Sequence, residues 1–232
     1  MAEQVKSKQR VADHGEVFTN EREVNAMLDM VKQETERIDS RFLEPACGDG
    51  NFLVEILRRK LAVVTQRYGK NPHDWEKYAF VATGSIYGVE LLADNAADCR
   101  ERLLSIVDET WKKAAKANGD PRFLNAIGYV LARNILNGDA LTMLDAEGNP
   151  IIFSEWSLVA GDKVKRRDFR LDEMLEGNVE PKETLSLFGD IAEDGGINPR
   201  TEWEYDEETQ AFIPKPITEY PLTSFYELMN CE

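Results

Sequence analysis

The apolar and polar positions of the chain fall into short extended runs and longer amphipathic segments. Arg41–Glu44 is a short extended run that ends at Pro45, and the apolar residues of Asn51–Tyr68 then recur at helical spacing. Two glycines, Gly48 and Gly50, lie between these segments. The pattern therefore predicts a strand, a glycine turn and a helix in succession.

The same alternation continues along the chain. Further predicted elements are a helix from Glu21 to about Arg37, a connection over 69–77, a strand ending near Glu90, helices over 93–117 and from Pro121, and strands over 134–141, 151–159 and 163–169. Strands that alternate with helices predict an α/β fold with a doubly wound, mainly parallel sheet and helices on both faces.

Charge divides the chain into unequal parts. Of the 43 acidic and 28 basic residues, 16 acidic and 3 basic residues lie from Leu171 onward, which places −13 of the net charge of −15 there. We predict a polar, flexible terminus over 1–13, a body over 14–176, and an acidic, partly irregular extension over 177–232. Within the extension, LSLF is one short amphipathic element, and the final apolar segment either packs on the body or docks on a partner.

Composition limits the environment and the chemistry. No charge-poor apolar stretch approaches the roughly 18 residues that span a bilayer, and the N-terminus MAEQVKSKQR lacks the apolar segment of a signal peptide, so we expect a soluble, cytoplasmic protein with no membrane partner. The three cysteines, Cys47, Cys99 and Cys231, form no CxxC pair and are predicted to be free thiols. His14 and His73 are isolated, so no metal site is predicted.

The stretch EPACGDGNF suggests a ligand site. In a doubly wound sheet ligands bind at the carboxyl ends of the strands, and glycines in the first turn let the backbone approach the ligand closely. The turn lacks the GK[ST] ending of a phosphate loop, and Glu44 and Asp49 disfavour an anionic ligand. Carboxylates suit a cationic group and ribose hydroxyls, which S-adenosylmethionine combines.

Acidic residues also end the next two predicted strands. Glu90 in YGVEL occupies the position of a ribose-binding carboxylate, and Asp139 in NGDAL is placed to accept from an adenine amino group. Each has an ordinary alternative, because Glu90 also suits a helix N-terminus and Asp139 suits a turn. Their recurrence at successive strand ends favours a shared site.

The segments HGEVFTNEREVNAMLD, FLEPACGDGNFLVEIL, GVELLADNAADCRERL and NILNGDAL resemble the N6-adenine DNA methyltransferases of bacterial restriction-modification systems, the gamma-type class of type I modification subunits and fused type II enzymes. The resemblance covers about residues 14–144 and implies a Rossmann-like S-adenosylmethionine-dependent methyltransferase fold. Asn20 departs from it, since the family usually has proline there. The implied cofactor-binding residues are Phe18, Thr19, Glu44, Ala46, Gly48, Asp49, Gly50, Asn51, Glu90, Leu91, Asp139 and Ala140.

The resemblance assigns these residues to parts of the cofactor. It implies that Phe18 and Thr19 help to hold the cofactor, that the glycine turn lines its methionine end, that Glu90 binds the ribose, and that Asp139 meets the adenine.

The family's catalytic tetrapeptide, [ND]PP[YF], is absent from the chain. In the family it grips the adenine amino group and stacks on the flipped base. IIFSEWSLV stands at the expected place, where Ser154, Glu155 and Trp156 offer an acceptor and a stacking ring. Because aromatic residues in strands mostly belong to the core, a structural role for these three residues is favoured.

The region beyond the body is too short and acidic to resemble a target-recognition region. The one basic cluster, Lys163, Lys165, Arg166, Arg167 and Arg170, suits either phosphate contact or a soluble sheet edge.

We therefore expect an S-adenosylmethionine-binding, DNA methyltransferase-like protein that reaches DNA through a partner specificity or methylase subunit in a hetero-oligomer. The alternative is a catalytically degenerate regulatory or assembly subunit, and RNA or protein methylation is weaker because the flanking motifs match the DNA family.

Overall fold

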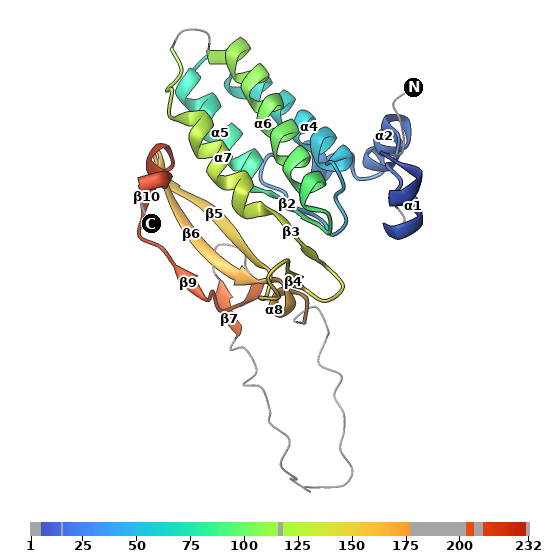
Figure 1. The fold of residues 1–232 in the computed structure, drawn as a ribbon. Helices are drawn as coiled ribbons and strands as arrows, with labels where there is room; N and C mark the ends of the chain where they lie inside the picture. Colours follow the sequence, from blue (N-terminus) through green and yellow to red (C-terminus); the bar gives the residue numbers. More distant parts are fainter. Residues whose placement is uncertain (1–5, 15, 116–117, 177–202, 207–210, 231–232) are drawn as a thin grey trace, which may run out of the picture.

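The computed structural model describes residues 6–14, 16–115, 118–176, 203–206 and 211–230 of the 232-residue chain (Figure 1). The helices are α1 (Lys8–His14), α2 (Glu21–Asp29), α3 (Lys32–Thr35), α4 (Asn51–Tyr68), α5 (Pro72–Gly84), α6 (Ala93–Ala115), α7 (Phe123–Asn134), α8 (Leu171–Glu176) and the 3-10 helix η1 (Phe225–Asn230). The strands are β1 (Phe42–Glu44), β2 (Ile86–Glu90), β3 (Ile135–Asp139), β4 (Leu144–Asp145), β5 (Ile152–Ala160), β6 (Lys163–Arg170), β7 (Trp203–Asp206), β8 (Ala211–Pro214), β9 (Thr218–Glu219) and β10 (Thr223–Ser224).

A four-stranded sheet in the order β1-β2-β3-β4 forms the centre of the fold. β1, β2 and β3 are parallel, with Glu44 beside Gly88 and Glu90 beside Asn137, whereas β4 is antiparallel to β3. The prediction of an α/β fold is confirmed, and the sheet is mixed. Its parallel part brings the carboxyl ends of three strands to one edge, which is where ligands bind in such sheets.

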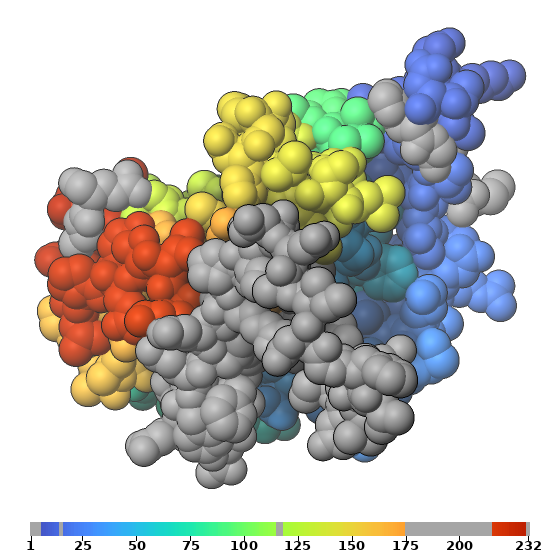
Figure 2. All heavy atoms as spheres, turned by 90° about the horizontal axis from the view of Figure 1, so that it is seen from below, coloured from blue at the N-terminus to red at the C-terminus, as the bar shows by residue number. Residues whose placement is uncertain are grey.

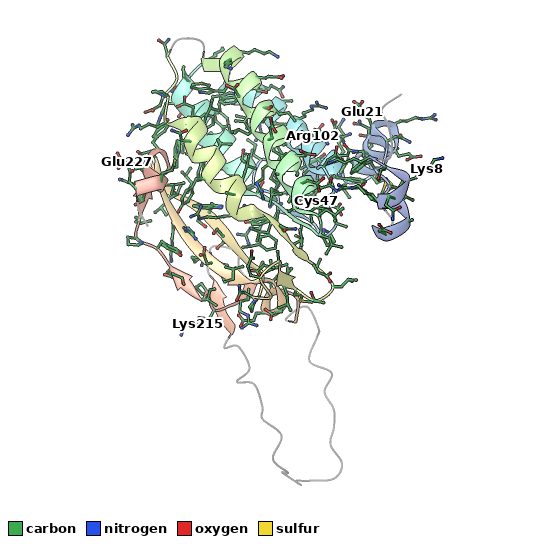
Figure 3. All side chains as sticks on the ribbon, viewed as in Figure 1. Lys8, Glu21, Cys47, Arg102, Lys215 and Glu227 are labelled. Atoms are coloured by element: carbon green, nitrogen blue, oxygen red, sulfur yellow. The ribbon has the colours of Figure 1, made fainter. Side chains whose placement is uncertain are left out.

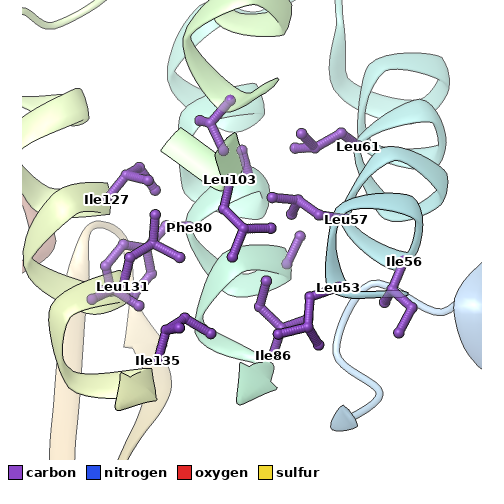
Figure 4. Close-up of a cluster of buried hydrophobic side chains, with 14 of the residues drawn as sticks. Leu53, Ile56, Leu57, Leu61, Phe80, Ile86, Leu103, Ile127, Leu131 and Ile135 are labelled. Carbon is purple, nitrogen blue, oxygen red and sulfur yellow. The ribbon is translucent and has the colours of Figure 1, made fainter. Parts of the chain in front are cut away.

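Helices α4 to α7 gather on one side of the parallel strands (Figure 1). Two helices follow β1 and two follow β2, and crossovers of the usual single hand place them on the same face. Leu53, Leu57, Phe80 and Leu103 are at most 1% exposed in the core that these helices share (Figure 4). Burial of each such side chain stabilises the fold by about 1.5–3 kcal/mol. The described residues thus differ from the predicted doubly wound arrangement, in which helices cover both faces.

The segment entering β5 covers part of the opposite face. Ile151, Phe153 and Leu171 are buried with Val89, and the rings of Phe153 and Tyr87 meet edge to face with centroids 5.3 Å apart. β5 pairs with β6 as an antiparallel hairpin in a second sheet of order β10-β6-β5. The predicted strand and its hairpin partner therefore exist, but β5 does not become a fourth parallel strand.

Helix α5 replaces a predicted connection and the start of a predicted strand. Asn71 caps it, with its side-chain oxygen accepting from the backbone N–H of His73 at 3.1 Å, and Pro72 occupies the first turn. Trp75, Ala79, Phe80 and Ala82 are at most 1% exposed, and Tyr78 and Val81 are partly buried against the same core. A helix buried on several sides lacks one-sided spacing, which is why the pattern resembled a long strand.

The N-terminal segment is more ordered than its sequence predicts. Lys8–His14 form α1, and the Arg10 guanidinium lies 2.6 Å from Asp94 at the start of α6 and 2.7 Å from Glu16. The predicted helix from Glu21 to about Arg37 is interrupted, because α2 ends at Asp29 and a turn separates it from α3. The predicted flexible terminus instead carries a helix that is attached to the body by ion pairs.

The end of the acidic extension packs on the body. β9 and β10 both pair with β6, and Phe225 of η1 is fully buried with its ring stacked 5.0 Å from that of Phe80. Figure 2 shows the C-terminal residues and the N-terminal helices at opposite sides of the molecule. The alternative in which the last apolar segment packs on the body is the observed one, while the LSLF element and Cys231 lie outside the described residues.

Candidate functional site

The turn between β1 and α4 requires glycine at two positions. Gly48 and Gly50 have φ values of 55° and 93°. A Cβ atom on Gly48 would lie 3.2 Å from the Phe18 ring, and one on Gly50 would lie 2.6 Å from the Cys99 sulfur. The Cys47 N–H donates to the Val89 carbonyl at 3.0 Å and ties the turn to β2. The glycines therefore permit both a left-handed backbone and close packing under the turn.

A cavity of about 560 Å³ opens at the carboxyl ends of β1, β2 and β3. It is lined by Glu16, Val17, Phe18, Thr19, Glu44, Pro45, Ala46, Cys47, Gly48, Asp49, Asn51, Phe52, Glu90, Leu91, Leu92, Asn95, Gly138, Asp139, Ala140 and Leu141. Every residue that the sequence assigns to the cofactor, except Gly50, lines this one cavity. Gly50 lies behind it against Cys99. Residues from four separate segments thus converge as the spacing of the motifs predicts.

Glu90 joins the turn to the beginning of α6. One carboxylate oxygen accepts from the Gly48 N–H at 2.8 Å, and the other accepts from the Leu92 N–H at 3.0 Å and from Asn95 Nδ2 at 3.3 Å. Glu90 is only 7% exposed. Its orientation is therefore fixed, and each carboxylate oxygen has two lone pairs with which to accept.

Asp49 is paired within the protein. Arg102 of α6 lies 2.6 Å from Oδ2 of Asp49 and donates to the side-chain oxygen of Asn51 at 3.0 Å; the turn that it reaches contains Cys47 (Figure 3). The other oxygen of Asp49, Oδ1, is buried and has no hydrogen-bond partner among the described residues. Because Arg102 offsets the charge of Asp49, Glu44 is the better candidate to attract a cationic ligand.

Glu44 is partly buried in the wall of the cavity. Burial raises the pKa of its carboxyl above the ordinary value of 4.5, while a hydrogen bond from the Ala46 N–H at 3.4 Å acts weakly in the opposite direction. A cation bound beside Glu44 would favour the ionised form. The carboxylate is thus in an environment that a positively charged group would stabilise.

The segment before α2 forms one wall of the cavity. Asn51 Nδ2 donates to the Thr19 carbonyl at 3.0 Å, and the Phe18 ring packs on Gly48. Across the cavity, Asp139 Oδ1 accepts from the Leu141 N–H at 2.8 Å, which is the turn role considered for this residue. Asp139 nevertheless lines the same cavity as Phe18.

The candidate catalytic residues lie away from this cavity. Ser154, Glu155 and Trp156 are at most 8% exposed, and none of them lines it. Ser154 donates to Asp168 at 2.7 Å, Glu155 is ion-paired with Arg41 and Arg167, and the Trp156 indole N–H donates to Asn134 Oδ1 at 3.2 Å. All three have the packing and pairing of structural residues.

Four of the five side chains of the basic cluster of the hairpin are also paired internally. Lys165 lies 3.2 Å from Glu219, Arg166 2.7 Å from Asp168, Arg167 2.6 Å from Glu155 and Arg170 2.5 Å from Asp172. Phosphate contact would have to compete with these ion pairs. The geometry favours the structural role for the cluster.

A larger cavity, of about 790 Å³, lies at the amino end of β1 and is lined in part by Glu155 and Trp156. Arg37 and Arg41 border it, but Arg37 lies 3.1 Å from Asp39 and Arg41 is paired with Glu155. If size alone decided, this larger cavity would be the candidate ligand site. The glycine turn and the converging acceptors are at the smaller cavity, and so are two residues with an unpaired buried oxygen, Asp49 and Asn95.

Sequence reasoning missed three residues of the site: Glu16, Asn95 and Arg102. Each is distant in sequence from its partner: Asn95 donates to Glu16 at 2.6 Å, and Arg102 reaches Asp49. Glu16 falls within the HGEVFT segment, so its neighbourhood was identified although its role was not. No local pattern distinguishes Asn95 and Arg102 from other polar residues of a long helix.

Comparison with family models, with curated proteins and with solved structures gives no match. Within the part of the chain that the structure describes, no helix has the length and apolar character to cross a membrane, and no three His, Cys, Asp or Glu side chains gather to hold a metal ion. Cys47 and Cys99 are free thiols, as predicted, and both are buried. The function is therefore inferred from the cavity itself.

Proposed function

We propose that the cavity at the glycine turn binds S-adenosylmethionine and that the protein is a DNA methyltransferase-like protein related to adenine-N6 methylation. The observation that carries this proposal is the convergence of residues 18–19, 44–51, 90–91 and 139–140 on one cavity, since these are the segments that the motifs assign to the cofactor. These segments are up to about 120 residues apart in sequence, so local sequence patterns alone do not explain why they line the same cavity.

The chemistry of the lining matches the parts of this cofactor. Glu44 would face the cationic methionine end, because its carboxylate is partly buried and no ion pair with it is present among the described residues, so a positive partner is favoured. Glu90 would hold the ribose, and the Phe18–Asp139 side would receive the adenine. Gly48 would let the cofactor lie close to the backbone, because its φ of 55° and its contact with Phe18 leave no room for a side chain.

A second candidate function is a cofactor-binding subunit that lacks catalytic residues of its own. The observation in its favour is that Ser154, Glu155 and Trp156 are buried in the hairpin network and do not line the cavity. Such a subunit would require a partner to grip the target adenine and to recognise DNA. The two candidates share the cofactor and differ in whether this chain transfers the methyl group by itself.

Calorimetric binding of S-adenosylmethionine tests the shared part. We expect wild-type protein to bind, Glu90→Gln to bind more weakly, and Glu90→Ala to bind about 10- to 100-fold more weakly, because a charged hydrogen-bond acceptor contributes about 1.5–3 kcal/mol. Glu219→Ala is the matched control, since it removes a carboxylate paired with Lys165 at 3.2 Å on the hairpin. Wild-type protein that does not bind, or Glu90→Ala that binds as wild type does, contradicts the proposal.

Transfer of a tritiated methyl group to unmethylated DNA separates the two candidates. Labelling of adenine by the isolated chain would establish the enzyme. Labelling only after addition of proteins encoded beside its gene would support the partner-dependent subunit, and Trp156→Ala should then impair folding rather than specifically the chemistry.

A further inference from the structure

Strand β5 has one edge that no other strand pairs with among the described residues. Its sheet runs in the order β10-β6-β5, so β6 pairs with one edge of β5 and the other edge is the end of the sheet. β6, by contrast, pairs on both sides, with β5 on one and with β9 and β10 on the other (Figure 1). The outer edge of β5 is therefore the place where this sheet can accept a further strand.

The register of the hairpin identifies the backbone groups of β5 that point outward. The carbonyl of Arg166 accepts from the backbone N–H of the residue that follows β9, at 3.0 Å, so the backbone groups of Arg166 point away from β5. Successive residues of a strand point these groups to opposite edges, so those of Arg167 point towards Glu155, its partner in the register. The N–H and carbonyl groups of Trp156 and Leu158 then point to the outer edge, where no hydrogen bond to them is present among the described residues.

The larger cavity, of about 790 Å³, lies along this edge. It is lined by four consecutive residues of β5, 155–158, and because side chains alternate between the faces of a strand, such a lining follows the backbone edge. The opposite wall is another consecutive segment, residues 37–41. In that wall the carbonyls of Ile38 and Ser40 already accept from Lys60. The cavity is thus a slot between two backbone segments, and β5 is the wall with free pairing groups.

The charges around the slot favour an acidic ligand. Arg37 and Arg41 are ion-paired with acidic residues, whereas Arg67, in the last turn of α4, has no ion pair among the described residues. Tyr68 and Tyr78 also line the slot, and their rings stack with centroids 3.8 Å apart. The lining therefore suits a segment that carries acidic side chains between apolar ones.

An extended peptide matches the chemistry of the slot. A strand edge presents N–H donors and carbonyl acceptors, and a peptide backbone offers both in return. The phosphodiester backbone of a nucleic acid has acceptors only, so it would leave the carbonyls of Trp156 and Leu158 without donors. Both walls of the slot belong to one chain, so a single extended segment enters it more readily than the folded sheet of a second copy.

We propose that the outer edge of β5 binds an extended, acidic segment of a partner protein, which adds to the sheet as a further strand beside Arg67. Backbone hydrogen bonds to Trp156 and Leu158 supply affinity, and Arg67 supplies the preference for acidic segments. This surface is separate from the cavity at the glycine turn. Its test uses no S-adenosylmethionine, so its outcome does not depend on the proposed function.

Fluorescence anisotropy with short, capped and labelled peptides tests the proposal. In one set glutamate alternates with valine, leucine or tyrosine, and in a matched set lysine replaces glutamate. We expect at least one acidic peptide to bind with a dissociation constant of about 100 μM or lower, and its lysine counterpart to bind about tenfold more weakly. If no acidic peptide binds, or if a single-stranded oligothymidylate binds in their place, the proposal is wrong.

N-methylation of the best acidic peptide distinguishes backbone pairing from other modes of binding. Alternate amides of an added strand face β5, and the remaining amides face away from it. Methylation of one alternate set should therefore weaken binding at least about tenfold, while methylation of the other set should leave the affinity within about twofold. Equal effects of the two sets would show that the peptide does not pair with the edge of β5.

Arg67→Glu tests the preference for acidic segments on the protein, with Arg58→Glu as the matched control. Both arginines are exposed on α4, but Arg58 does not line the slot. We expect Arg67→Glu to bind the acidic peptide about tenfold more weakly and the lysine peptide more tightly, while Arg58→Glu binds both as wild type does. Near-ultraviolet circular dichroism checks that both variants fold. Equal affinities of the two variants for the acidic peptide overturn the assignment of Arg67.

Discussion

The amino and carboxyl ends of the parallel strands both bury polar side chains, and they differ in how those side chains are paired. At the amino end Lys60 is fully buried and donates to the carbonyls of Ile38, at 3.1 Å, and Ser40 and to the Ser85 hydroxyl at 2.6 Å. At the carboxyl end Asp49 and Asn95 each retain a buried oxygen without a partner among the described residues. Lys60 is thus fully paired within the fold, whereas Asp49 and Asn95, two residues that line the proposed ligand cavity, each keep one unpaired oxygen.

This difference is a better guide to function than cavity size. The larger cavity, about 790 Å³, lies at the amino end, and its border includes ion-paired side chains such as Arg37 and Arg41. The smaller one, about 560 Å³, adjoins a turn whose two glycines have positive φ, and it is lined by residues with unpaired oxygens. Buried acceptors without donors raise the free energy of the protein, and a ligand that supplies donors recovers it.

The largest expected effect is at the amino end, on stability alone. Lys60→Met removes a donor from the carbonyls of Ile38 and Ser40, leaves Ile38 with only the 3.3 Å hydrogen bond from the Ser85 hydroxyl, and should lower the free energy of unfolding by about 3 kcal/mol in urea titrations. Lys112→Met, which removes an exposed i,i+4 pair with Asp108, should change it by about 0.5 kcal/mol or less. Affinity for S-adenosylmethionine should stay within about twofold in both variants. If Lys60→Met were as stable as wild type but bound S-adenosylmethionine more weakly, the binding role would belong to the amino end of the strands and the structural role to the carboxyl end.

A glycine substitution at the carboxyl end should affect both stability and binding. Gly50→Ala combines a φ of 93° with a Cβ atom 2.6 Å from the Cys99 sulfur, and we expect a loss of about 2 kcal/mol in the free energy of unfolding together with weaker cofactor binding. Gly128→Ala in α7, where a new Cβ meets nothing within 4 Å, should be neutral or stabilising by up to about 1 kcal/mol. Equal thermal unfolding of the two variants would show that the turn tolerates a side chain.

The ionisation of Glu44 should make binding depend on pH. Because burial raises the pKa of this carboxyl, it becomes protonated as the pH falls from about 7 towards 4.5, and the attraction for a cationic ligand is lost. We expect S-adenosylmethionine to bind up to about tenfold more weakly at the acidic end of this range, by calorimetry. Glu44→Gln should bind weakly at every pH in the range. A wild-type affinity independent of pH would remove Glu44 from the cationic subsite.

The smallest expected effect concerns α1. Arg10→Ala removes the contacts to Glu16 and Asp94 and should weaken cofactor binding by about fivefold at most in low salt, through looser placement of Asn95. The difference from wild type should shrink in 1 M salt, where the screening length is about 3 Å. Arg122→Ala, which removes an exposed arginine paired with Asp120 at the amino end, is the control and should leave affinity unchanged. An Arg10→Ala effect that persists in high salt would indicate a direct role in binding.

The sequence predicts well those elements whose cause is local. β1, α4, α6 and β3 follow from apolar spacing and from the glycines between Glu44 and Asn51, and the predicted bounds of α4 match the structure. Helix α5 was missed because several faces of it are buried, which removes the one-sided pattern. The hairpin was predicted, but its position beside the parallel strands is held by contacts such as Arg41–Glu155, which join residues far apart in sequence and leave no local pattern.

The residues of the candidate site also fall into those that the local sequence predicts and those that it does not. Residues on the strand-end turns were predicted, because the fold places every strand end at one edge. Asn95 and Arg102 were not, since each acts through a partner on another segment, Glu16 in one case and Asp49 in the other. Helical position alone carries no information about such partners.

Because β9 and β10 both pair with β6, residues near the C-terminus cover the edge of β6 that does not pair with β5. An uncovered strand edge is a template for pairing with another chain. Loss of residues 218–230 would therefore expose this edge together with the Phe80 ring that stacks on Phe225, and would favour association between molecules.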